Sequence, residues 1–164
     1  MDTVVRGFIA RVRGDRGTIR MLLILLGSFA LFTYLQPEIF LNPVNLQNIM
    51  IASPEIGVIA IAMMLAMLTG GIDLSTVAVA NLSAITITTL YSSLMASDPA
   101  QAAQMMPFIV LLGLVVGLAG GLFNGFLISY VGITPILATL GSMQIFNGLA
   151  IVWTGGKTLY GAPQ

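Results

Sequence analysis

Charged residues almost disappear from this chain after its first 20 positions, and this restricts what it can fold into. A soluble fold needs a charged outer layer, but 7% of the residues are charged, 57% are apolar and the mean hydropathy is +1.01. The sequence therefore predicts an all-α, polytopic transmembrane bundle with five spans, near residues 18–35, 53–69, 74–96, 107–130 and 136–154. The charged residues after Arg20 are Glu38, Glu55, Asp73, Asp98 and Lys157.

Residues 1–20 form an arginine-rich segment ahead of the first apolar run. Because positively charged flanks stay on the cytoplasmic side, we expect a cytoplasmic N-terminus. A cleaved signal peptide is the alternative, but no small-residue cleavage site precedes residues 36–38, so an uncleaved anchor is favoured. The arginines are Arg6, Arg11, Arg13, Arg16 and Arg20.

A Gly-Gly-Ile-Asp-Leu-Ser sequence interrupts the apolar pattern between the second and third spans and predicts a broken helix. Gly70 and Gly71 can end a helix, because glycine reaches left-handed backbone angles cheaply. Asp73 and Ser75 can each begin the next helix by accepting hydrogen bonds from its free N–H groups. Asp73 has a second interpretation, since a lone acid at membrane depth could contact a solute, a coupling ion or a gating partner.

The second span is short if it starts where local signals place its beginning. Ser53 resembles an N-cap and Pro54 a first-turn proline, so residues 39–52 are predicted to lie at the outer interface. A helix from there to Gly70 would be roughly 24 Å long, less than the roughly 30 Å of hydrocarbon. Either the interfacial segment extends the helix past a proline kink or the break lies below the membrane surface, and the buried break is favoured.

Glycines recur every four residues in the fourth span. One side of that helix should therefore be a groove against which another helix packs closely. A polar outer loop over residues 97–106 is expected to precede the span. The repeated glycines are Gly113, Gly117, Gly121 and Gly125.

Four amide side chains are predicted at membrane depth. Amides pair with sugar hydroxyls both as donors and as acceptors, so these residues could line a pathway for a hydroxylated solute. Hydrogen bonds between helices are the alternative, and the residue pattern leaves both open. The amides are Asn81, Asn124, Gln144 and Asn147, which join Asp73 as candidate pathway residues.

The composition argues against catalysis in this chain. It contains no cysteine and no histidine, so it lacks a thiol nucleophile, the commonest general base and the commonest metal ligands. Gly156-Lys157-Thr158 resembles the end of a phosphate-binding loop, but Ile151 stands where the first glycine of that motif should be. We therefore expect no metal, no cofactor and no nucleic-acid partner, and any ATP must be bound by another chain.

Several motifs resemble the ribose-type branch of bacterial ABC importer permeases. They are Leu-Thr-Gly-Gly-Ile-Asp-Leu-Ser at 68–75, Gly-Gly-Leu-Phe-Asn-Gly at 120–125, Gly-Ile-Thr-Pro-Ile-Leu-Ala-Thr-Leu-Gly at 132–141 and Trp-Thr-Gly-Gly-Lys at 153–157. They occur in the family's order, and the resemblance covers roughly residues 20–164. One departure is Thr-Val-Ala at 76–78, where family members often have Val-Gly-Ser, and this leaves the substrate open.

The resemblance implies a multi-pass subunit of the bacterial inner membrane that takes part in importing a sugar or sugar-like solute. Its partners would be a second permease subunit, cytoplasmic ATP-binding subunits, a periplasmic solute-binding protein and membrane lipid. Family permeases are about twice as long, so residues 21–164 are interpreted as the N-terminal half of a transmembrane domain, in a truncated or partial chain. The mechanism would be alternating access without covalent chemistry.

Two other functions stay open on the sequence. One is half of an ion-coupled secondary transporter, with Asp73 as the proton or sodium site of a broken helix. The other is a non-transporting helical membrane assembly protein built on the glycine groove. Uptake by an ion-coupled transporter should continue after ATP depletion. Complex formation by an assembly protein should not respond to changes at Asp73.

Overall fold

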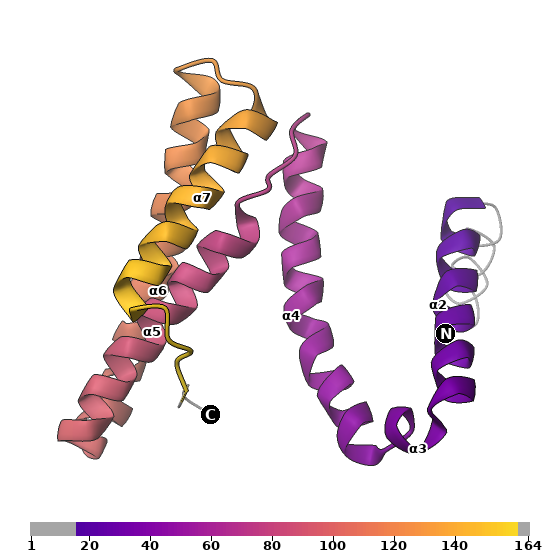
Figure 1. Ribbon diagram of the computed structural model, residues 1–164. Coiled ribbons are helices and arrows are strands. Elements are labelled where there is room, and N and C mark those ends of the chain that lie inside the picture. The colour runs from indigo at the N-terminus through magenta and orange to yellow at the C-terminus, as the bar shows by residue number, and fades with distance from the viewer. Residues whose placement is uncertain (1–15, 161–164) are drawn as a thin grey trace, which may run out of the picture. The chain divides into compact units, whose positions relative to one another are not determined.

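The computed structural model describes residues 16–160, and within that range every regular element is a helix. Five helices are long and apolar enough to cross a membrane, which confirms the prediction of an all-α chain with five spans. The arginines before residue 16 lie outside the described residues. The helices are α2 (Arg16–Leu35), α3 (Pro37–Phe40), α4 (Pro43–Leu68), α5 (Thr76–Ser97), α6 (Pro99–Ser129) and α7 (Pro135–Thr154) (Figure 1).

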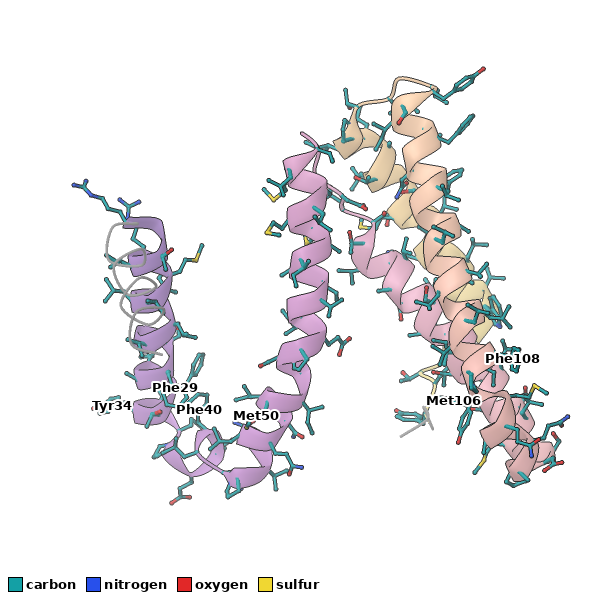
Figure 2. The ribbon with its side chains drawn as sticks, turned by 180° about the vertical axis from the view of Figure 1, so that it is seen from behind. Phe29, Tyr34, Phe40, Met50, Met106 and Phe108 are labelled. Atoms are coloured by element: carbon teal, nitrogen blue, oxygen red, sulfur yellow. The ribbon has the colours of Figure 1, made fainter. Side chains whose placement is uncertain are left out.

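The chain divides into two compact units, residues 1–55 and 56–164. In the described part of the first unit, α2 and α3 pack through aromatic rings. Phe29 and Phe40 approach each other (Figure 2), with ring centroids 5.0 Å apart in an edge-to-face arrangement. The ring centroid of Phe32 lies 5.8 Å from that of Phe40. The Asn45 amide donates to the Phe40 carbonyl at 2.9 Å, which ties the start of α4 to this corner.

Helix α4 is longer than the second span predicted from the sequence. It starts at Pro43 and contains Pro54 in its interior, so Ser53 is not an N-cap. The Ser53 hydroxyl instead donates to the Ile49 carbonyl at 2.7 Å, a bond within the helix. The 26 residues correspond to about 39 Å, enough to cross about 30 Å of hydrocarbon. The length argument for a break below the surface is therefore wrong, and the helix extends past its proline.

Helices α5, α6 and α7 form the core of the second unit and lie side by side (Figure 1). The buried cluster joins Ala78 and Leu82 of α5 to Phe146 and Ala150 of α7. Most large apolar side chains of these helices face outward, as expected for surfaces in contact with lipid or further helices.

Helix α6 begins earlier than the sequence indicated. Asp98 is its N-cap and accepts hydrogen bonds from the backbone N–H groups of Ala100 and Gln101 at 3.0 and 3.1 Å. The expected outer loop over residues 97–106 is therefore largely helical. Pro107, taken as the start of the span, lies inside the helix, where membrane helices tolerate proline.

The glycine groove of α6 follows a different line from the predicted one. A Cβ atom at Gly113 would come within 2.5 Å of the Ile87 side chain, and one at Gly117 would touch Ser83 of α5. The next close contact is at Gly120, where a Cβ atom would lie 2.9 Å from Val79. Each four-residue step on a helix rotates by about 40° beyond a full turn, so the fourfold repeat leaves the contact face after two positions. The predicted packing at Gly121 and Gly125 is not found within the described chain, since a Cβ atom at either would meet nothing within 4 Å.

Candidate functional site

The segment between α4 and α5 has a defined path. Helix α4 ends at Leu68, and the N–H groups of Gly70 and Gly71 donate to the carbonyls of Met67 and Ala66, at 3.1 and 3.2 Å. Gly70 has a φ of +88°, a left-handed angle that residues with a Cβ rarely adopt. Helix α5 does not begin until Thr76, so residues 69–75, here termed the break, are non-helical.

The break lies directly against the start of α7. A Cβ atom at Gly71 would be 2.8 Å from Cβ and 3.0 Å from Cγ of Pro135. Because the proline ring is rigid, it cannot move aside as a flexible side chain would. Because Gly71 has no Cβ atom, it allows the break to approach the start of α7 closely, although the two segments are more than 60 positions apart in the sequence.

Thr139 of α7 fastens the break at a second point. Its hydroxyl oxygen accepts the Leu74 N–H at 3.1 Å and lies 2.8 Å from the Pro135 carbonyl and 3.2 Å from the Ile72 carbonyl. The hydroxyl has one proton, which goes to one of these carbonyls at a time. The threonine side chain is 1% exposed, and its hydrogen bonds to the break are partly buried. Sequence reasoning did not single out Thr139, although it lies within one of the family-like motifs.

Asp73, Ser75 and Asn124 form a hydrogen-bonded chain that joins the break to α6. Asp73 Oδ1 accepts the Ser75 N–H at 2.8 Å and the Ser75 hydroxyl at 2.7 Å. The Ser75 oxygen accepts in turn from the Asn124 amide at 2.6 Å. Asp73 thus receives an N–H group immediately before α5, much as expected. Ser75 flanks α5, but its side chain accepts no hydrogen bond from the first N–H groups of the helix. The Ser75 hydroxyl bonds to Asp73 and Asn124 instead.

A first pocket of about 360 Å³ adjoins this hydrogen-bonded chain, and we call it the break pocket. Asn124, in its wall, is 4% exposed, and its Oδ1 has no hydrogen-bond partner. The bare backbone at Gly121 and Gly125 borders the same pocket, so these glycines leave open space there. The wall consists of Ala66, Thr69, Gly71, Ile72, Asp73, Gly121, Asn124, Gly125, Ile128, Ser129, Pro135 and Thr139.

A second pocket of about 700 Å³ contains the other three candidate amides, and we call it the amide pocket. Asn81 projects from α5, whereas Gln144 and Asn147 project from α7. Lys157, in the segment after α7, is the one charged residue in its wall. The structure thus divides the five candidate pathway residues between two pockets, with Asp73 and Asn124 in one and Asn81, Gln144 and Asn147 in the other.

The amides of the larger pocket have unused hydrogen-bonding capacity. Within residues 16–160, the side chains of Asn81, Gln144 and Asn147 make no hydrogen bond. Asn124, by contrast, bonds to Ser75 across two elements. A hydrogen bond between elements is therefore seen for Asn124, and for the other three amides both interpretations left by the sequence stay open.

Neither pocket contains a cluster of acidic, histidine or cysteine ligands. No group of three or more acidic, histidine or cysteine side chains occurs in the part of the chain that the structure describes. The break pocket contains one carboxylate and the amide pocket none. Apart from Asp73 in the break pocket and Lys157 in the amide pocket, the side chains of both walls are amides, hydroxyls and apolar groups, which can bind polar molecules by hydrogen bonds.

Comparison with known proteins gives one family and several relatives. Residues 45–164 match the family described as the permease component of branched-chain amino acid transport systems. The xylose/arabinose import permease protein XylH of Sulfolobus acidocaldarius is 35% identical over 130 residues, covering 77% of this chain and 35% of that protein. The D-allose transport system permease protein AlsC of Escherichia coli is 35% identical over 132 residues, covering 80% of this chain and 38% of that protein.

A third relative is the autoinducer 2 import system permease protein LsrC of Salmonella typhimurium. It is 31% identical over 105 residues, which cover 64% of this chain and 28% of that protein. The chain thus spans about a third of the length of the curated relatives it matches. No solved structure is significantly similar to it.

Proposed function

Because this chain belongs to the family of permease components of branched-chain amino acid transport systems, we propose that it acts in an ATP-driven importer for a sugar or sugar-like solute. The names of its relatives support the choice of solute, since they include permeases for xylose and arabinose, for allose and for autoinducer 2. The match covers all of the chain from early α4 onward, so the elements that form both pockets belong to the family region.

The observation that carries the proposal is the set of free amides in the amide pocket. Asn81, Gln144 and Asn147 can each donate and accept, and none uses that capacity within the described chain. A hydroxylated solute offers matching donors and acceptors without charge. The pocket volume of about 700 Å³ falls within the range of small-molecule sites and exceeds what one monosaccharide requires.

The two pockets fit an alternating-access mechanism. With the arginine-rich N-terminus in the cytoplasm, five successive crossings bring the end of α7 to the outer side. The amide pocket includes residues from that end of α7, whereas the break pocket includes its first turn and the last residues of α6. A solute would meet the amide pocket from outside, and the break pocket belongs to the inner half of the structure.

The energy source and the delivery of solute belong to other chains. Within the proposal, cytoplasmic ATP-binding subunits bind ATP, a periplasmic solute-binding protein delivers the sugar, and a second permease subunit completes the pathway in the bacterial inner membrane. This chain contributes solute-facing side chains and moving helices, and it performs no chemical step.

The proposal is tested by solute uptake into cells or vesicles that contain the assembled importer with this chain as permease. Replacing Gln144 or Asn147 by leucine should lower uptake at least tenfold, because each change removes both a donor and an acceptor from the pocket. Gln104→Leu is the matched control, since Gln104 is an exposed amide of α6 outside both pockets and its loss should leave uptake unchanged.

Two outcomes would contradict the proposal. Equal uptake in the pocket variants and the control would show that the free amides do not meet the solute. Uptake that persists after ATP depletion but stops when the ion gradient is removed would instead identify an ion-coupled transporter.

A further inference from the structure

Several oxygen atoms around the break pocket have hydrogen-bond acceptor capacity that the described chain does not use. Two of the three hydroxyls in its wall have given their protons to backbone carbonyls: Thr69 donates to Ala66 at 2.7 Å, and the nearest carbonyl to the Thr139 hydroxyl is that of Pro135 at 2.8 Å. The Thr69 oxygen is then left with acceptor capacity only, whereas the Thr139 oxygen already accepts the Leu74 N–H.

The buried amide of Asn124 adds an acceptor of the same kind. Its nitrogen donates to Ser75, and because the single Ser75 proton goes to Asp73, this network fixes which end of the amide is the oxygen. The oxygen Oδ1 is enclosed and has no hydrogen-bond partner among residues 16–160. An unpaired buried carbonyl is rare in folded proteins and usually marks a missing ion, a water molecule or a functional contact.

Asp73 supplies one negative charge, and among the described residues no cation lines the pocket to balance it. Only its Oδ1 is used, for Ser75, and Oδ2 has no partner in the described chain. Every other residue of the pocket wall is uncharged. Lys157, the one described cation in the second unit, lines the amide pocket and not this one.

From these three observations we propose that the break pocket binds one monovalent metal cation of the size of sodium, partly hydrated, next to Asp73 and Asn124. A single carboxylate balances a single positive charge, whereas calcium and magnesium sites generally use more carboxylate ligands. The volume of about 360 Å³ leaves room for several water molecules around the ion. This site is independent of the proposed function, since a bound cation holds the break in place whatever drives transport.

The test measures thermal unfolding of the purified full chain in nanodiscs of zwitterionic lipid. Trp153, the one tryptophan of the chain, reports on α7 by its fluorescence. Sodium chloride is exchanged for choline chloride at constant ionic strength. Choline serves as the control cation because it is too large for a site of the size of sodium. We expect the unfolding temperature to rise by about 3 to 6 °C when sodium reaches ten times its dissociation constant, and to go on rising with the logarithm of the sodium concentration.

Asp73→Asn is the variant that tests the site. Asparagine keeps an oxygen for the Ser75 N–H and hydroxyl, so the break should survive while the charge is lost. The sodium response should disappear, and unfolding in choline should match that of the unaltered chain. Asp98→Asn is the matched control, because Asp98 also accepts backbone N–H groups in a turn but borders neither pocket, and it should keep the response.

Equilibrium dialysis with radioactive sodium measures binding directly. This second measurement uses the unaltered chain, so it does not require a variant to fold. About one ion per unaltered chain supports the site. The proposal is overturned by equal unfolding temperatures in sodium and choline, by a response that survives Asp73→Asn, or by calcium acting at far lower concentration than sodium.

Discussion

Replacing Thr139 by valine isolates one hydrogen bond that holds the break. Valine keeps the branched shape of threonine and removes the hydroxyl, so the Leu74 N–H loses its acceptor at 3.1 Å. Thr139 is 1% exposed, so water cannot readily replace the hydroxyl. Leaving a buried N–H group unsatisfied costs about 1–3 kcal/mol, and the bond to Leu74 is partly buried, so up to this amount is expected.

Amide hydrogen exchange on the chain in nanodiscs measures this cost at the affected site. A loss of about 1–3 kcal/mol predicts that the Leu74 amide exchanges about 5 to 140 times faster in Thr139→Val, since about 1.4 kcal/mol corresponds to a factor of ten. Local opening of the break is the event that this exchange reports.

Thr86→Val is the matched control for this prediction. Thr86 is also buried, at 5% exposure, but its hydroxyl donates only to the Leu82 carbonyl of its own helix. Its loss leaves no N–H group unpaired, so exchange at Leu74 should not change. Unaltered exchange at Leu74 in Thr139→Val, or equal acceleration in the two variants, would refute the assignment of Thr139 as the residue that fastens the break.

Two further predictions concern packing and capping. Gly120→Ala should destabilise the second unit by about 1–3 kcal/mol in a thermal unfolding assay, because its Cβ atom would lie 2.9 Å from Val79. Gly121→Ala is the matched control and should be neutral or slightly stabilising, because the space at that position is open. Equal effects would contradict the packing line through Gly120. Asp98→Ala should destabilise the start of α6 by about 0.5–2 kcal/mol by removing its N-cap, which would be measured as faster amide exchange at Ala100. Asp98→Asn should keep the exchange rate of the unaltered chain, because asparagine also caps helices. Unchanged exchange at Ala100 in Asp98→Ala would argue against the cap.

The sequence was sufficient to predict the helical spans because long apolar runs are a local property. It was less reliable at helix starts. Pro54 and Pro107 were both interpreted as first-turn residues, a rule learned from soluble helices, and both lie inside longer membrane helices. The capping signal of Asp98 followed by proline was present in the sequence, but the residues after it were assigned to a loop.

The candidate site was predictable in its residue types and not in its grouping. The amides and Asp73 stood out because polar groups are costly at membrane depth. Their division between two pockets depends on how α5, α6 and α7 pack, which no local pattern contains. Thr139 was missed for the same reason, since its importance comes from the Leu74 N–H, 65 positions away in sequence. The solute-pathway role of these residues stays a prediction until uptake is measured.

The contact between Gly71 and Pro135 has a consequence for how this protein can change over generations. Because the proline ring lies where a Cβ atom at position 71 would be, a larger residue there is compatible with the fold only after position 135 has lost its ring. The two positions should therefore constrain each other's substitutions, and the order in which mutations arise matters: the exchange at 135 must come first. A related chain with a larger residue at position 71 should therefore also have a residue other than proline at position 135, 64 residues away.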